Sequence, residues 1–61
     1  MDVFAAMKLN TAQAKEAQLM TKLGITLDDA AILAKAGYTQ TTIAGMTAEE
    51  KEIALKKAKN Q

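Results

Sequence analysis

Two pairs of adjacent carboxylates, Asp28-Asp29 and Glu49-Glu50, are the side chains of this sequence best suited to acid–base chemistry or to binding a hard cation. Cooperation within a pair is limited, because adjacent residues of a helix project about 100° apart. Each pair also closely follows a Thr that can begin a helix, where the helix dipole favours negative charge. Helix capping therefore accounts for both pairs.

The residue types that are missing exclude most catalytic and metal chemistry. The sequence contains neither His nor Cys, which removes the commonest general base, the commonest transition-metal ligand and any thiolate or disulfide. It also contains no glycine-rich phosphate loop and no arrangement of a nucleophile with a base. We therefore predict a non-enzymatic protein with no catalytic residue, no metal site and no cofactor.

Positive charge is carried by Lys alone, and the net charge is only +1. Arg makes most bidentate contacts to guanine and phosphate, and a near-neutral chain lacks the field that gives non-specific affinity for nucleic acid. These features disfavour a nucleic-acid partner without excluding one. The cluster of Lys56, Lys57 and Lys59 could bind an anionic surface, but it is typical of the negative end of a helix.

The apolar residues predict one small domain with a thin core. Hydrophobic residues make up 49% of the 61 residues, but 13 of the hydrophobic residues are Ala, and only Phe4 and Tyr38 are aromatic. Such a core offsets chain entropy only narrowly, which predicts modest stability or stabilisation by a partner. No stretch approaches the roughly 18 apolar residues of a membrane span, and no secretory signal is recognisable. We therefore expect a soluble cytoplasmic protein that has no membrane partner.

Each of the three glycines is followed by an apolar residue and then by a Thr. The triplets are Gly24-Ile25-Thr26, Gly37-Tyr38-Thr39 and Gly45-Met46-Thr47. A glycine in the left-handed conformation commonly ends a helix, the next residue often packs back on that helix, and Thr is a preferred N-cap. We therefore predict that every triplet ends one helix and begins the next. In this arrangement Ile25 packs on Met20, and Tyr38 packs on Leu33.

These boundaries predict an all-α fold, a small bundle of three to four short helices in a single domain over 1–61. The expected helical segments are 2–23, 27–36, 40–44 and 48–59. The first segment is one helix or two, because Asn10-Thr11 is another plausible cap. The core of the domain is expected to be the three-helix region 27–59. Thr47 and Glu50 have the spacing of a capping box.

Helical periodicity also predicts which residues are buried. The expected stripe of the first segment is Leu9, Ala12, Leu19 and Leu23, interrupted by Glu16, and that of the second is Leu27, Ala30, Ala31, Leu33 and Ala34. In the last segment Ile53 and Leu55 project about 160° apart. Either this helix is wedged between two others, which is the simpler interpretation, or one of the two side chains is exposed as a contact.

Residues 30–58 resemble the ubiquitin-associated (UBA-like) three-helix bundle. Members of that family end their first helix in a Met-Gly-Phe or Met-Gly-Tyr loop and then add two further helices. Ala36-Gly37-Tyr38 stands at this point here, followed by a short and then a longer helical segment. In the family, the loop and the end of the last helix form an apolar patch that grips a partner protein. The resemblance implies that Gly37, Tyr38 and Leu55 belong to such a patch.

The same region also resembles the helix-turn-helix, whose turn is typically Gly, then Val or Ile, then Ser or Thr, with an Ile or Val four residues later. Gly37-Tyr38-Thr39 and Ile43 are similar to this pattern, which implies that residues 40–42 face the bases. In a second register Gly45-Met46-Thr47 is the turn, and the last segment, which carries the Lys residues, is the recognition helix.

Two hypotheses of function follow. The first is a small non-enzymatic module that binds another protein, or another copy of itself, through an apolar patch. The predicted patch residues are Gly37, Tyr38, Met46, Ile53 and Leu55. The alternative is a small DNA-binding or regulatory accessory protein with a degenerate helix-turn-helix, such as one encoded by a mobile element or a virus. Its predicted contacts to nucleic acid are Gln40, Thr41, Thr42, Lys56 and Lys57.

Overall fold

The computed structural model describes residues 8–60, which form four helices and no strand. The helices are α2 (Thr11–Thr21), α3 (Leu27–Lys35), α4 (Gln40–Ala44) and α5 (Ala48–Lys59). The prediction of a small all-α bundle is therefore confirmed. Between residues 8 and 60, no helix has both the length and the apolar character needed to cross a membrane.

The predicted helix boundaries agree closely with the observed ones. α4 and α5 have the expected bounds, and α3 ends at Lys35, one residue before the predicted end. The plausible cap at Asn10-Thr11 is real, because α2 begins at Thr11 with Asn10 as its N-cap. α2 ends at Thr21, and residues 22–24 form turns. The part of the first segment that was expected over 2–7 lies outside the described residues.

A polar side chain caps the first turn of each of these helices. Asn10, Thr26, Thr39 and Thr47 accept a hydrogen bond from the backbone N–H three residues later, at 2.8, 3.3, 3.3 and 3.2 Å. The capping box predicted at Thr47 is confirmed, because Glu50 Oε1 accepts from the Thr47 N–H at 2.8 Å. These bonds satisfy N–H groups for which a helix has no internal acceptor. Each Thr that ends a glycine triplet therefore begins a helix as predicted.

Two of the three glycines end their helices in the predicted way. Gly24 and Gly37 have φ angles of 89° and 103°, a region that favours glycine. After Gly37, the Tyr38 N–H donates to the Leu33 carbonyl at 3.0 Å, as in a Schellman motif. The expectation of a third left-handed turn is wrong, because Gly45 has a φ of −86°. There the Gly45 N–H donates to the carbonyl three residues back at 3.2 Å, so a tight right-handed turn ends α4 without any left-handed residue.

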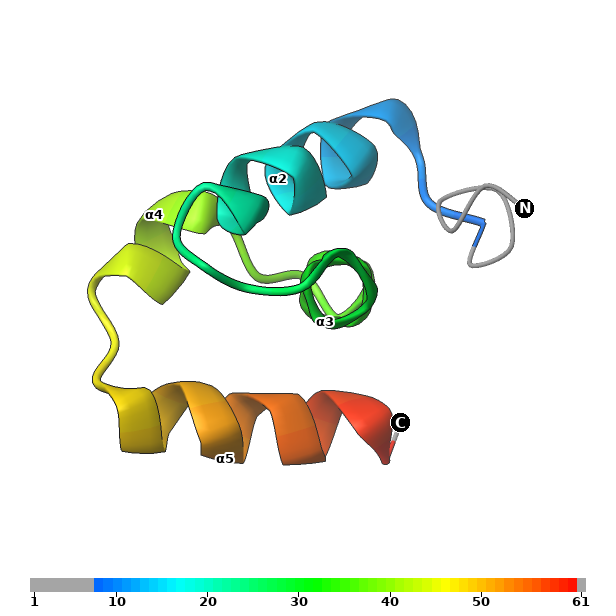
Figure 1. Ribbon diagram of the computed structural model, residues 1–61. Helices are drawn as coiled ribbons and strands as arrows, with labels where there is room; N and C mark the ends of the chain where they lie inside the picture. The colour runs from blue at the N-terminus through cyan, green and yellow to red at the C-terminus, as the bar shows by residue number, and fades with distance from the viewer. Residues whose placement is uncertain (1–7, 61) are drawn as a thin grey trace.

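α3 is the central helix of the bundle (Figure 1). α2 and α5 lie across it on opposite sides, and α4 contacts α2. The buried residues are Ala17 and Met20 of α2, Ala30, Ala31, Leu33 and Ala34 of α3, Ile43 of α4 and Ala54 of α5. Five of these eight are Ala, so the helices approach closely around three larger side chains. The predicted buried face of α3 is confirmed except at Leu27, which is 42% exposed.

The stripe predicted for the first segment is confirmed only in part. Leu23 packs against the core, and Leu9 and Leu19 are partly buried, but Ala12 is exposed, and the fully buried residues of α2 are Ala17 and Met20. The fully buried residues lie one position along the helix from the predicted stripe. Glu16, which was expected to interrupt that stripe, is partly buried, and its carboxylate accepts a hydrogen bond from the backbone at the start of α4.

Candidate protein-binding site

The two large side chains of α5 have different surroundings. Leu55 is partly buried and packs against the core together with Ala58, next to the buried Ala54. Ile53 projects away from this side, and it is 55% exposed. The interpretation of α5 as a helix wedged between two others is therefore wrong. One face of α5 covers α3, and the opposite face leaves a large apolar side chain in contact with solvent.

Tyr38, Met46 and Ile53 line one open hollow of about 220 Å³. Tyr38 and Met46 are the middle residues of the last two glycine triplets, and Ile53 comes from α5. Both turn residues are partly buried and pack against the core, so the fold holds them in place. The rest of the lining is Glu50, Ala54 and Lys57. The hollow therefore combines apolar side chains with one acidic and one basic side chain.

Tyr38 also borders a second hollow of about 150 Å³ on the side of α2. Its lining is Ala12, Gln13, Glu16, Ala34, Gly37, Tyr38 and Thr39. Of the five residues predicted to bind a partner, three thus share the first hollow and Gly37 lies in the second. Leu55 lines neither and faces the core.

The carboxylate of Glu16 makes a structural contact that the sequence analysis missed. Its Oε1 accepts a hydrogen bond at 2.7 Å from the N–H of Gln40, the first residue of α4 and 24 residues away in the chain. α4 has no acidic side chain in its own first turn, so a distant one supplies the negative charge that the helix dipole favours there. This bond fixes α4 to α2 and thereby helps to position the turns on either side of α4.

The residues predicted for the nucleic-acid alternative lie on two helices. Thr41 and Thr42 of α4 are exposed, and the Thr42 hydroxyl is 2.9 Å from that of Thr39. Lys56 and Lys57 are exposed on α5. Gln40, the remaining residue of this group, is partly buried at the start of α4. α4 itself has five residues, which is a short helix for insertion into a groove.

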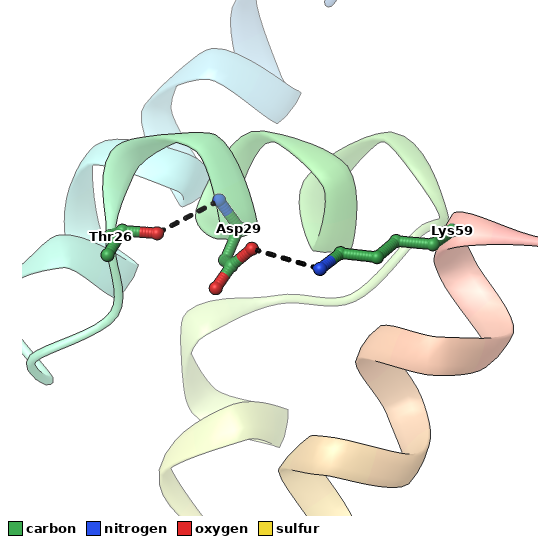
Figure 2. A network of polar contacts seen from close by, with 3 residues as sticks. All are labelled: Thr26, Asp29 and Lys59. Atoms are coloured by element: carbon green, nitrogen blue, oxygen red, sulfur yellow. Dashed lines mark hydrogen bonds and ion pairs between the residues drawn. The ribbon is translucent and has the colours of Figure 1, made fainter.

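The acidic pairs lie at helix N-termini, as the sequence indicated. The Asp29 carboxylate forms an ion pair with Lys59 at 3.7 Å, while the Asp29 backbone N–H donates to Thr26 (Figure 2). This contact joins the start of α3 to the end of α5. Glu50 completes the capping box of α5. Over residues 8–60, no three acidic side chains are grouped so that they could hold a metal ion.

The first hollow has the composition of a small protein contact site. Its lining combines four side chains that are largely apolar, among them a Tyr and a Met, with one acidic and one basic side chain, and many protein interfaces also contain both kinds. No protein-family model, curated protein or solved structure matches this chain. What the surface can bind must therefore be inferred from its own geometry and charge.

Proposed function

We propose that this chain is a non-enzymatic binding module that recognises a protein through the hollow lined by Tyr38, Met46 and Ile53. The observation that carries the proposal is the exposure of Ile53, 55% of which is open to solvent beside two other large apolar residues. The layout of α3, α4 and α5, a helix ending in Gly-Tyr followed by a short and a longer helix, is compatible with the UBA-like resemblance, in which a protein is the ligand.

The binding free energy expected at this site is modest and comes from a few large side chains. Full burial of an Ile side chain contributes roughly 1.5–3 kcal/mol, so covering the exposed part of Ile53 would contribute about 1 kcal/mol. Tyr is among the residues that most often dominate interfaces, and the flexible thioether of Met adapts to irregular surfaces. Because the Tyr38 ring and Met46 are already packed against the core, little side-chain freedom remains to be lost on binding.

The test is capture of partner proteins by the immobilised chain from an extract of the cells that produce it. Ile53→Asp places a charge in the hollow, and Leu27→Asp makes the same change at another exposed apolar residue, outside the hollow. We expect the wild-type chain and the Leu27 variant to capture the same proteins and the Ile53 variant to lose them, while helical circular dichroism is retained by all three. Equal capture by both variants would refute the proposal.

The nucleic-acid alternative is separated from this proposal by a gel mobility-shift measurement with duplex DNA at low salt. We expect no retention of the DNA, because the chain has a net charge of +1 and no Arg. A true DNA-binding protein would be retained and would lose affinity with a log–log salt slope of about −0.9 for each phosphate neutralised. Retention with such a slope would favour the alternative.

A further inference from the structure

The charges around Ile53 are arranged symmetrically along α5. Glu49 and Glu50 precede it by four and three residues, and Lys56 and Lys57 follow it by three and four. At about 100° per residue, all four lie within roughly 60° of Ile53 around the helix axis. All four are exposed, as is Ile53. α5 therefore presents an outward face with an apolar centre, an acidic half and a basic half.

We propose that this face binds a second copy of the chain, with the two α5 helices antiparallel about a twofold axis at Ile53. The inference rests on the proposed function and names its partner. In this arrangement Ile53 meets Ile53 of the copy, and Glu49 and Glu50 of each chain face the basic half of the other. A twofold contact requires a self-complementary surface, and this face satisfies that condition.

The parallel arrangement is disfavoured by the same charges. It would place acidic side chains against acidic ones and basic against basic, which is unfavourable. Within residues 8–60 the one ion pair joins Lys59 to Asp29, so Lys56 and Lys57 are not held in ion pairs there. Glu49 and Lys57 each lie about 6 Å from Ile53 along the axis, from a rise of about 1.5 Å per residue. One antiparallel register therefore aligns the apolar centre and both charged halves together.

The size of the contact predicts weak association. α5 has 12 residues and is about 18 Å long, so a contact centred on it belongs with interfaces below about 1,200 Å² in total. We expect the dimer to form at protein concentrations on the order of 0.1–1 mM, the range of a weak complex.

Sedimentation equilibrium of the purified chain and four variants tests the proposal. Glu49→Lys alone places a basic side chain opposite Lys56 of the copy, and Lys56→Glu alone places an acidic side chain opposite Glu49 of the copy. We expect each variant by itself to associate about tenfold more weakly than the wild-type chain, because two ion pairs of modest strength become repulsive. An equimolar mixture of the two should regain association, since the introduced Lys of one chain would then face the introduced Glu of the other. Ile53→Asp should remain monomeric, and Leu27→Asp should associate like the wild-type chain.

Circular dichroism of each variant establishes that the helices are retained. If association recovers in the mixture, its loss in the single variants was caused by charge repulsion and not by lower stability. Three results would overturn the proposed antiparallel dimer: a wild-type chain that stays monomeric at about 1 mM, charge-reversed variants that associate as strongly as the wild type, or a mixture that associates no more strongly than its components. If another protein is still captured and is lost with Ile53→Asp, the proposed function survives while this inference fails. If neither association nor capture occurs, both fail.

Discussion

Replacement of two glycines by Ala is expected to change the stability of this protein in opposite directions. Gly37 has a φ of 103°, whereas Gly45, in the same position of the repeated triplet, has a φ of −86°. A Cβ added at Gly37 meets no atom within 4 Å, and one added at Gly45 meets only carbonyl oxygens at 3.7 and 4.0 Å, which are ordinary contacts. Steric overlap is therefore absent at both sites, and the backbone angle alone distinguishes them.

The expected magnitudes follow from this difference. An L-residue held at a positive φ costs about 1–2 kcal/mol, and Ala lowers the entropy of the unfolded chain relative to Gly by about 0.4–1 kcal/mol. Gly37→Ala should therefore reduce the free energy of unfolding by about 1 kcal/mol. Gly45→Ala should increase it by about 0.4–1 kcal/mol, because only the second effect applies. For a domain of this size, 1 kcal/mol corresponds to about 4–8 °C in Tm.

Urea and thermal unfolding followed by circular dichroism at 222 nm measure both changes. Gly24→Ala provides a second positive-φ site, with φ 89° and no atom within 4 Å of the added Cβ, and it should behave like Gly37→Ala. The reasoning would be refuted if Gly37→Ala were as stable as the wild type, or if Gly45→Ala were destabilised to the same extent.

Three further predictions concern single contacts. Glu16→Ala removes the acceptor of the Gln40 N–H and should lower the free energy of unfolding by about 1–2 kcal/mol. Glu16→Gln keeps an acceptor oxygen and should lower it less. Urea unfolding of both variants measures the difference. Leu33→Ala should cost about 2–5 kcal/mol because Leu33 is completely buried, and loss of most helical dichroism at 25 °C would be the expected result. Lys59→Ala should change the urea midpoint hardly at all, because the distance in the Lys59–Asp29 pair is long, at 3.7 Å, and the Lys59 side chain is 55% exposed. A decrease of more than about 1 kcal/mol in the free energy of unfolding would contradict this.

The helix boundaries could be predicted from the sequence because they depend on short-range signals. An N-cap acts over about three residues, and a glycine stop acts over about five. Thr39 and Thr47 therefore mark the starts of α4 and α5 whatever packs around them. Even α4, which with five residues is too short to be stable alone, has its predicted bounds. Gly45 is the exception, because a tight right-handed turn ends such a short helix equally well.

The burial of individual residues was less predictable because it depends on distant parts of the chain. Glu16 interrupts an apolar stripe in the sequence, yet it faces inward because a backbone N–H of α4 needs an acceptor there. A usable signal was the absence of an acidic side chain from the first turn of α4. For Ile53 and Leu55, periodicity shows that the two project apart. Which of them faces the core depends on where α3 lies, and no local pattern contains that information.

Ile53 lies outside a core that is itself small. Five of the eight buried residues are Ala, and a single core in a domain of this size rarely supplies more than about 3–5 kcal/mol. Each of the four N-caps contributes about 1 kcal/mol, which is substantial beside such a core. A chain with so few large apolar side chains would gain stability by burying Ile53 within its own fold. Instead Ile53 is 55% exposed between an acidic and a basic half of α5, and this is the apolar surface that the proposed contact would remove from solvent.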